Sequence, residues 1–558
     1  MGCSLSPGER ARVRAGKPTR FRASVSRRWP IFLALSLLAF AIRLPGLGDR
    51  PMHTDEATNA YILGQLLAGH PFHYDPLDRH GPALAAFTLP LVKLEGARDF
   101  SELSEAGLRL APVFAGTATV LMWGAGVELF GFVPCLVAAL IFVFAPLPLY
   151  YGRYFIHESL FVASTLGLIL AGAHAFHRHS LVAAGLTGFC AAIMLAAKET
   201  APLHFCCLLL AGLVVWLTFR REGSTTPRKG DGWDSHDNYG FASRREHSAS
   251  LWPQCRMLLA GFAVFAITFI LLFTWFGQNW AVFGDLIRAV PNFAARAGGQ
   301  GHEKPFWYYA NLLAGGWSGA ALLALAVLGT GLSLFSFDHR RHPGAMGLAN
   351  QGTGTPSALG LRGLAIYGLL LFLFYSFIPY KTPWLALNFW PAIALMSGVA
   401  VEWFWFSHLK FLHRMIALTL LILLGTLMIR DGWERVFVNP AAPQNPYAYA
   451  HTVDDLLGLP RRLTELCQAR HLTDPRIAVV AADAWPLPWY LRAYAQVGFW
   501  QPGQDPGPAD FYVTSPEAAE KMAGVLTHYR PEYFGLRPEV LIILWVPMPA
   551  LPGTPASL

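Results

Sequence analysis

The sequence predicts an α-helical membrane protein that crosses the bilayer many times and ends in a small α/β domain. Of its 558 residues, 54% are hydrophobic and only 14% are charged, whereas soluble proteins average about 25% charged residues. The apolar residues gather in runs of about 20, the length at which a helix spans a bilayer. Basic residues cluster in a few polar segments between these runs, as the positive-inside rule expects of cytoplasmic loops.

The apolar runs define about eleven predicted spans, an odd number that puts the two chain ends on opposite sides of the membrane. The first covers residues 29–47, and the others cover 107–130, 132–150, 158–176, 181–197, 201–219, 257–278, 308–334, 363–379, 385–406 and 412–429. The N-terminal segment 1–28 is a basic tail, with eight Lys and Arg residues against the single acid Glu9. We therefore predict a multi-pass protein of the plasma (inner) membrane, with a cytoplasmic N-terminus and the C-terminus outside.

The chain divides into three predicted regions. The basic cytoplasmic tail 1–28 precedes a membrane domain at 29–429, in which an outer loop at 48–107 carries nine acidic and four basic residues. The loops 220–256 and 335–362 are rich in arginine and would face the cytoplasm. In the last region, 430–558, segments 476–483 and 539–546 have the pattern of buried strands, and 459–470 that of a helix. This region is predicted to be an extracytoplasmic α/β domain.

Several function classes find no support in the sequence. It contains no DxD, HExxH, GxSxG or P-loop motif, and no GxGxxG in a strand-turn-helix context. The seven cysteines are scattered without a CxxC pair, so they indicate neither a disulfide framework nor a zinc site. The net charge of +8 comes from short loops, so no nucleic-acid partner is expected. No cofactor is expected either.

The unusual charged clusters outside the cytoplasmic loops all fall on the outer side of the predicted topology. They are Asp55-Glu56, the segment 150–159, Lys198-Glu199, the loop 285–304 and the segment 380–384. Ionisable groups at a membrane edge are costly and tend to mark function. We therefore expect these clusters to converge on a single site.

Asp55 and Glu56 are adjacent, so on a helix their side chains point about 100° apart and cannot both face one ligand. One would act as a base while the other holds structure or a hydroxyl. The alternative is that the aspartate simply favours a helix N-terminus, where Thr54 would be the N-cap.

Each basic candidate also has two interpretations. Arg153 would bind phosphate through its planar fork, or close a turn by pairing with Glu158. Lys198 would bind the same phosphate, or be neutralised by Glu199. Lys381 has no acid near it in sequence, so a bound anion is its natural partner.

The remaining candidates are one histidine and the C-terminal side chains. His157 would bind substrate, or be a packed interfacial residue. Asp483 and Trp485 would bind a sugar or acceptor, since aromatic faces suit sugar rings, or pack within the α/β domain.

The order of several short motifs resembles membrane-embedded glycosyltransferases of the GT-C fold. The match covers about residues 13–430 and lies in the protein O-mannosyltransferase and aminoarabinose-transferase group, which is glycosyltransferase family 39-like. A bacterial and archaeal subgroup, described as flippase-associated or mannosyltransferase-like, is more similar still. The motifs are HTDEA at 53–57, HGP at 80–82, YGRYFIHE at 151–158, YKTPWL at 380–385, NPYAY with HT at 445–452, and WPLPWYLR at 485–492.

This resemblance implies an inverting hexosyltransferase that moves a sugar from a polyprenyl-phosphate carrier to an acceptor hydroxyl at the outer face. Asp55 would be the catalytic base, with Glu56 beside it. Arg153, Lys198 and Lys381 would stabilise the lipid phosphate that leaves. The substrate-binding candidates are His53, His157, Glu158, Asp483 and Trp485.

The resemblance also bears on partners and metals. A polyprenyl-phosphate-linked sugar and the membrane lipid are the expected partners, whereas the sugar and the acceptor stay open. Metal-dependent relatives carry a paired-acid motif in the second outer loop, where this chain has only Glu158, so no metal is expected.

A non-catalytic protein is the alternative, either a flippase-associated component or a transporter that handles a lipid-linked sugar. Transporters tend to show inverted repeats and to place ionisable groups near mid-membrane. The sequence shows no clear repeat and its charges lie at the outer edge, which favours the enzyme.

Overall fold

The computed structural model describes residues 28–77, 80–222, 252–299, 301–335, 358–406 and 411–548. The predicted basic tail therefore lies outside the described residues except for Arg28. Most of the predicted cytoplasmic loops 220–256 and 335–362 also lie outside them.

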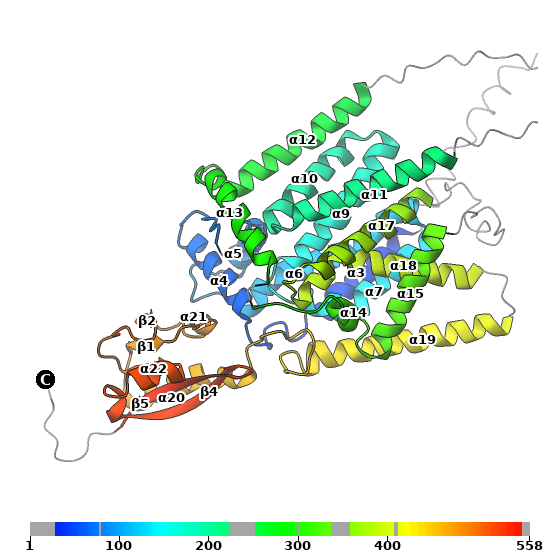
Figure 1. The fold of residues 1–558 in the computed structure, drawn as a ribbon. Coiled ribbons are helices and arrows are strands. Elements are labelled where there is room, and N and C mark those ends of the chain that lie inside the picture. Colours follow the sequence, from blue (N-terminus) through cyan, green and yellow to red (C-terminus); the bar gives the residue numbers. More distant parts are fainter. Residues whose placement is uncertain are drawn as a thin grey trace, which may run out of the picture.

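The membrane domain is a bundle of helices that run along a common axis (Figure 1). Among the described residues, eight helical segments are long and apolar enough to cross a membrane. Three shorter apolar helices, α3 (Trp29–Arg43), α7 (Phe132–Phe144) and α10 (Leu181–Ala197), pack among them. The long helices are α6 (Glu105–Phe130), α9 (Glu158–Arg178), α11 (Ala201–Glu222), α12 (Trp252–Phe273), α15 (Gly316–Phe335), α17 (Ala358–Phe377), α18 (Trp390–Phe406) with η2 (Pro383–Phe389) before it, and α19 (Phe411–Trp433) with η3 (Glu434–Val438) after it.

These helices lie on all the predicted spans, so the chain is a multi-pass helical membrane protein, and its number of crossings stays a prediction. Two predicted spans are interrupted. The span 132–150 breaks into α7 and α8 (Pro146–Tyr151), because Ala145 is extended before Pro146. The span 308–334 breaks into α14 (Tyr308–Leu313) and α15 at Gly316, whose φ of +83° suits glycine.

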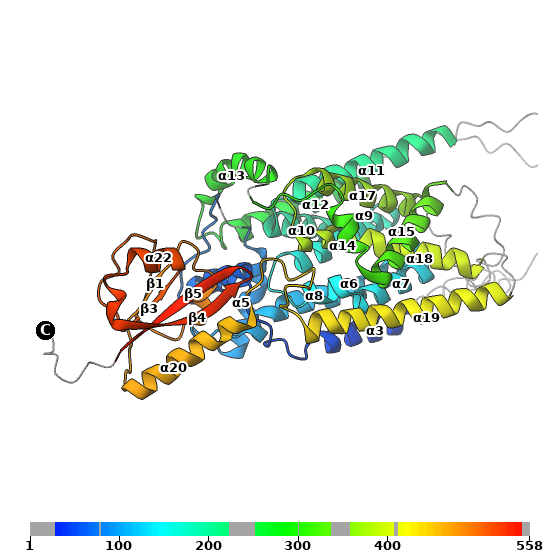
Figure 2. The ribbon, with the colours of Figure 1, turned by 60° about the horizontal axis from the view of Figure 1, so that its bottom comes forward.

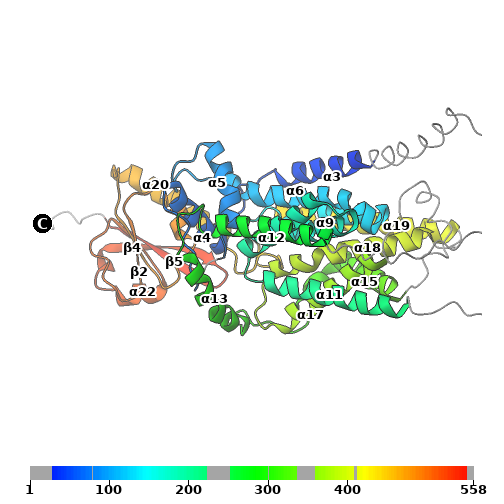
Figure 3. The same ribbon diagram turned by 90° about the horizontal axis from the view of Figure 1, so that it is seen from above.

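The predicted outer loop contains two helices, α4 (Thr54–Leu67) and α5 (Ala83–Glu95). A third helix outside the bundle, α13 (Val282–Ala297), follows α12. All three lie at the end of the bundle that is nearer the C-terminal domain (Figures 1 and 3).

The C-terminal region forms a five-stranded mixed sheet in the order β2-β1-β3-β5-β4. β1 (Ile477–Val480) pairs in parallel with β2 (Val497–Trp500) and β3 (Phe511–Thr514), whereas β5 (Val540–Pro547) runs antiparallel to β3 and β4 (Tyr529–Arg537). The predicted strands 476–483 and 539–546 are thus present as β1 and β5, and the predicted helix 459–470 is α20 (Gly458–Arg470). Figure 2 shows α20 beside this sheet. The short elements are η4 (Asp454–Leu457), α21 (Leu487–Tyr490), α22 (Pro516–Lys521) and η5 (Leu526–His528).

The C-terminal domain is joined to the loop before α4 by buried hydrogen bonds. The Tyr490 hydroxyl accepts a hydrogen bond from the Met52 backbone N–H at 2.8 Å, and the Thr452 hydroxyl donates to the Met52 carbonyl at 2.7 Å. The Trp489 indole donates to Glu105 at 2.7 Å, at the start of α6. These contacts attach the domain to the end of the bundle that carries α4.

A buried ionic cluster holds the loop between α3 and α4. Glu56 has no exposed surface, and both of its oxygens accept hydrogen bonds from Arg109, at 2.8 and 2.9 Å. Arg50 adds a contact at 3.0 Å. Burial alone would raise the pKa of Glu56, but the two arginines lower it well below its usual range. Arg109 also donates to the backbone carbonyls of Leu47 and Arg50, so the cluster ties the loop to α6.

We expect Glu56→Gln to cost about 3–5 kcal/mol of stability, because it leaves two buried guanidinium groups without a counter-charge. Thermal unfolding of the purified protein in detergent measures this loss. Asp55→Asn, at the neighbouring half-exposed position, is the matched control and should unfold like the wild type. A Glu56→Gln protein that unfolds at the wild-type temperature would show that the cluster does not hold the loop.

Candidate functional site

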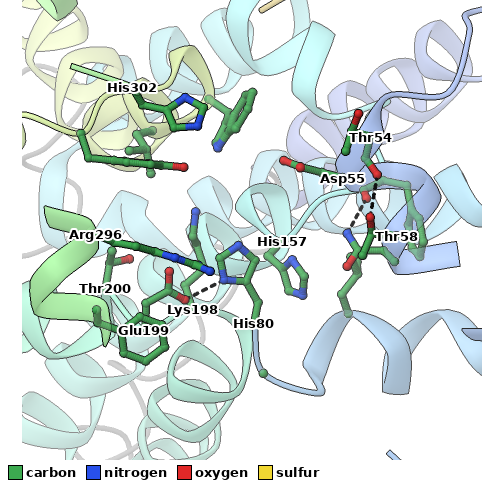
Figure 4. Close-up of a pocket in the computed structure, with 18 of the residues that line it drawn as sticks. Thr54, Asp55, Thr58, His80, His157, Lys198, Glu199, Thr200, Arg296 and His302 are labelled. Atoms are coloured by element: carbon green, nitrogen blue, oxygen red, sulfur yellow. Dashed lines mark hydrogen bonds and ion pairs between the residues drawn. The ribbon is translucent and has the colours of Figure 1, made fainter. Parts of the chain in front are cut away.

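A cavity of about 660 Å³ lies where α4 and α13 meet the end of the bundle. Trp485 from the C-terminal domain also lines it. Figure 4 shows Asp55 on one wall, and His80, Lys198 and Glu199 grouped away from it. The full lining is Thr54, Asp55, Thr58, Asn59, Ile62, Phe72, His80, Gly81, Leu84, Ala85, Phe155, His157, Lys198, Glu199, Thr200, Leu203, Phe293, Arg296, Ala297, His302, Tyr375, Ile378, Tyr380, Trp384, Leu385 and Trp485.

The structure separates the two adjacent acids at the start of α4. The Asp55 side chain is 46% exposed and lines the cavity, whereas Glu56 points into the buried cluster. The N-cap of α4 is His53 rather than the expected Thr54. The His53 ring accepts the Asp55 backbone N–H at 3.0 Å, while Glu56 accepts the His53 N–H at 3.1 Å. This reciprocal capping box orients the first turn of the helix.

Two ion pairs lie together on the other wall, and neither joins residues that are close in the sequence. Lys198 pairs with Glu158, and both side chains are almost fully buried. Glu199 pairs instead with His80, with 2.7 Å between its Oε2 and the His80 Nδ1. The alternatives in which Lys198 pairs with Glu199, or Arg153 with Glu158, are therefore wrong. The adjacent Lys198 and Glu199 point to different partners because α10 ends at Ala197 and the backbone is extended at Lys198.

Gly81 brings His80 close to this wall. A Cβ atom at Gly81 would lie 2.3 Å from the Ala196 carbonyl oxygen, so only glycine lets the two backbones approach this closely. The contact brings residues 80–82 against the end of α10, where Lys198 and Glu199 follow. In the HGP motif, Gly81 is therefore required by close packing and His80 by its pairing with Glu199.

Helix N-termini border the cavity, and those of α4, α9 and α11 are three of them. The first turn of α4 contributes Thr54 and Asp55, the residue before α9 is His157, and the residue before α11 is Thr200. A helix N-terminus carries about half a positive charge and offers free N–H groups, so it attracts anions. Together with Lys198, these three ends make the cavity an environment that suits an anionic ligand.

The two histidines of this wall differ in charge. Burial alone would lower the pKa of His80, but the charge and hydrogen bond of Glu199 raise it above its ordinary value. Burial, and then the charge on His80, lowers the pKa of His157 well below its ordinary value. The rings lie 4.8 Å apart, so a ring that loses its proton readily sits beside one that holds its proton to higher pH than usual.

The cavity contains residues that the sequence did not single out as ligands. His80, Glu199, Arg296 and His302 lie in segments noted for their charge or motif, whereas Tyr375 lies inside a predicted span. The His302 Nδ1 lies 2.9 Å from the Tyr449 hydroxyl. A tyrosine in an apolar run gives no local signal that it faces a cavity, so sequence reasoning could not have found Tyr375.

Arg153 and Lys381 were predicted to bind phosphate, but neither lines the cavity. Arg153 donates three hydrogen bonds of 2.7–2.9 Å to backbone carbonyls at residues 43, 45 and 46. Lys381 is buried and donates to the carbonyls of Ile378 at 2.5 Å and Lys304 at 3.1 Å. Backbone oxygens therefore occupy the positions where an anion was expected.

Of the predicted substrate-binding residues, His157 and Trp485 line the cavity. His53, Glu158 and Asp483 do not. His53 is held by the Asp55 N–H and by the Tyr449 carbonyl at 3.2 Å from its Nε2. Asp483 is more than half exposed and pairs with Arg537. Among the described residues, no group of three His, Cys, Asp or Glu side chains is arranged to hold a metal ion.

Comparison with solved structures identifies the fold. No family model matches the sequence, and no curated protein matches it. ArnT from Cupriavidus metallidurans, in a crystal structure bound to undecaprenyl phosphate, gives a TM-score of 0.56 at 14% identity, covering 92% of this chain and 97% of ArnT. The apo state of the same ArnT gives a TM-score of 0.57 at 16% identity, with the same coverage of both chains. The archaeal oligosaccharyltransferase AglB from Archaeoglobus fulgidus, in complex with an inhibitory peptide and a dolichol-phosphate, gives 0.50 at 14% identity, covering 92% of this chain and 76% of AglB.

ArnT and AglB are glycosyltransferases with the GT-C fold, and this chain shares that fold along nearly its whole length. The predicted fold class is confirmed, including a C-terminal domain built on a sheet. The finer assignment to the family 39-like subgroup stays a prediction.

The Lys198–Glu158 pair makes a prediction about stability. Lys198→Met should cost about 3–5 kcal/mol, because Glu158 is left buried and unpaired. The double variant Lys198→Met/Glu158→Gln should recover most of that loss, since neither charge remains. Thermal unfolding of the wild type, both single variants and the double variant gives the interaction free energy between Lys198 and Glu158. Additive losses would contradict the pairing.

Proposed function

We propose that this protein is a glycosyltransferase that moves a sugar from a polyprenyl-phosphate carrier to an acceptor hydroxyl. One observation carries the proposal. A single cavity has a partly exposed carboxylate, Asp55, on one wall and a group of cations and helix N-termini on another. Transfer from a lipid phosphate needs a base for the acceptor and positive charge for the leaving group, and the cavity offers both.

The phosphate of the donor would bind at the cationic wall. Lys198 and His80 lie there, beside the N-termini of α9 and α11. Preorganised positive groups aimed at a developing charge are a large source of rate enhancement. The Thr200 hydroxyl, just before the first turn of α11, also lines the cavity and adds a polar group to this wall.

Asp55 is the proposed general base. Its carboxylate takes the proton of the acceptor hydroxyl as that oxygen forms a bond to the anomeric carbon. The bond from this carbon to the phosphate oxygen breaks on the opposite side, and the lipid phosphate leaves with the electron pair. Attack opposite the leaving group inverts the anomeric configuration. The separation of Asp55 from the cationic wall supports this geometry.

The acids and bases outside the cavity receive different roles in this proposal. Glu56, predicted beside Asp55 as a catalytic residue, acts as a positioning residue that holds the turn bearing Asp55. Arg153 and Lys381 hold backbone segments rather than the donor. Glu158 orients Lys198, and His53 caps the helix that carries Asp55.

The acceptor would approach from the side of the C-terminal domain. Asp55 shares its stretch of α4 with Thr58 and Asn59, and Trp485 of the C-terminal domain lines the same cavity. An aromatic face suits a sugar ring, which supports an acceptor or sugar contact at Trp485. We further propose a hexose as the donor sugar, an outward-facing site in the plasma (inner) membrane, and a cytoplasmic N-terminus.

Transfer from radiolabelled undecaprenyl-phosphate hexoses, in membranes containing wild type or Asp55→Asn, tests the proposal. Wild type should move label into an acceptor or into water. Asp55→Asn should lower that rate about 10²- to 10⁴-fold, the range for losing a general base. Its unfolding temperature and its binding of undecaprenyl phosphate should stay at wild-type values, because the side chain is half exposed and lies on a different wall of the cavity from Lys198 and His80.

Thr58→Ser, in the same wall of the cavity, is a suitable control and should transfer at nearly the wild-type rate. Equal turnover by wild type and Asp55→Asn would remove Asp55 as the base. Specific binding of the lipid phosphate without turnover of any donor would favour the non-catalytic, flippase-associated alternative instead.

A further inference from the structure

His80 is a cavity residue that uses one ring nitrogen and leaves the other open. Its Nδ1 lies 2.7 Å from Glu199, and the side chain is 32% exposed. Within the described part of the chain, no hydrogen bond involves its Nε2. The ring is held in place by Gly81, which packs against Ala196, and by His157 at 4.8 Å.

The partner on Nδ1 determines what Nε2 can do. Burial alone would raise the pKa of Glu199, but His80 and Lys198 lower it well below its usual range, so Glu199 is ionised and only accepts hydrogen bonds. Nδ1 must then carry a hydrogen in both charge states of the ring. Nε2 carries one only in the imidazolium, and becomes a bare acceptor when the ring is neutral. Loss of one proton therefore turns a charged donor into a group that repels phosphate oxygens.

We propose that His80 is a ligand of the donor phosphate, and that its protonation controls donor binding. Glu199 is the positioning residue that holds the ring and keeps Nδ1 protonated. This inference rests on the proposed function of the cavity as a lipid-phosphate site, and deepens it by naming a ligand that gains or loses a proton. Lys198 stays charged, and the helix N-termini do not titrate.

Among the charged groups around the cationic wall, His80 is the one whose charge we expect to change with pH. Lys198 is matched by Glu158, and His157 is neutral because of burial. Asp78 and Arg79, adjacent in sequence, lie outside the described residues. The described titratable groups that face His80 or its partner are Glu199, Lys198, Glu158, His157, Arg296 and Tyr74, while Asp55 lies on another wall of the same cavity.

The direction of the pH effect follows from the raised pKa of His80. Burial lowers this pKa, but Glu199 and then Glu158 outweigh burial and lift it above the ordinary value of 6.5. His80 is therefore protonated at and below pH 6.5 and loses its proton as the pH rises through the raised value. Donor affinity should follow, with full binding at pH 6.5 and weaker binding above the raised pKa.

The test is equilibrium binding of undecaprenyl phosphate to the full-length protein in detergent, from about pH 6 to about pH 9, a range that brackets histidine titration. Undecaprenol, which lacks the phosphate, is the control ligand. The variants are His80→Gln, which cannot titrate, His80→Lys, which stays charged, and Glu199→Gln. Each affinity is expressed relative to His80→Gln at the same pH, because the phosphate itself loses a proton near pH 6.

At pH 6 the wild type should bind about 10- to 100-fold more tightly than His80→Gln, the effect of one charged hydrogen bond. This ratio should fall toward one as the pH rises through the pKa of His80. His80→Lys should keep a high ratio across the range. Glu199→Gln should move the fall to lower pH, because the neutral amide no longer stabilises the imidazolium. A structural role for His80 alone would not produce this set of pH profiles.

A wild-type ratio that does not change with pH would overturn the inference while the proposed function stands. So would a His80→Lys protein that loses affinity with rising pH as the wild type does. If His80→Gln fails to fold, the pH profiles of wild type and His80→Lys make the same comparison. Undecaprenyl phosphate that binds no better than undecaprenol at any pH would reject both the inference and the proposed function.

Discussion

The end of the bundle that carries α4 depends on one buried carboxylate that contacts two guanidinium groups. Glu56 is out of contact with water, and Arg109 and Arg50 are 1% and 7% exposed. Charges buried this deeply are tolerated only when every partner is present, so the loop between α3 and α4 has one stable path. That path places the neighbouring Asp55 at the cavity. The two adjacent acids therefore have different roles. Glu56 stabilises the buried cluster, whereas Asp55 stays half exposed at the cavity.

The cavity itself is close to charge balance when it is empty. Lys198 is paired with Glu158, and His80 with Glu199, so each of these two cations has its own carboxylate partner. The extra positive potential comes from the N-termini of α4, α9 and α11, which belong to the backbone. A site built in this way keeps much of its attraction for anions through the fold rather than through exposed side chains, whose charge the surrounding salt would screen.

The sequence predicted the features that depend on local pattern. Apolar runs gave the helices, and strand-like runs gave β1 and β5, because each element buries a face that its own residues define. The sequence could not predict which residues form ion pairs, because the partner of Lys198 lies 40 residues away and that of Glu199 lies 119 residues away. The sequence showed no partner for Lys381 because its partners are backbone carbonyl oxygens, which any residue type can supply. The clustering of charge predicted a site at this end, but not which charges would face it.

The bond between Met52 and Tyr490 joins residues 438 positions apart. Thr452 holds the same residue from a second side, 400 positions along. The ribosome therefore makes the loop before α4 about 400 residues ahead of the residues that anchor it. Until the C-terminal domain has emerged and folded, the loop lacks these anchors, and Trp485 is missing from the cavity wall. The cavity is therefore complete only after the C-terminal domain has been made, and a protein truncated after α19 would lack the part of the cavity wall that Trp485 supplies.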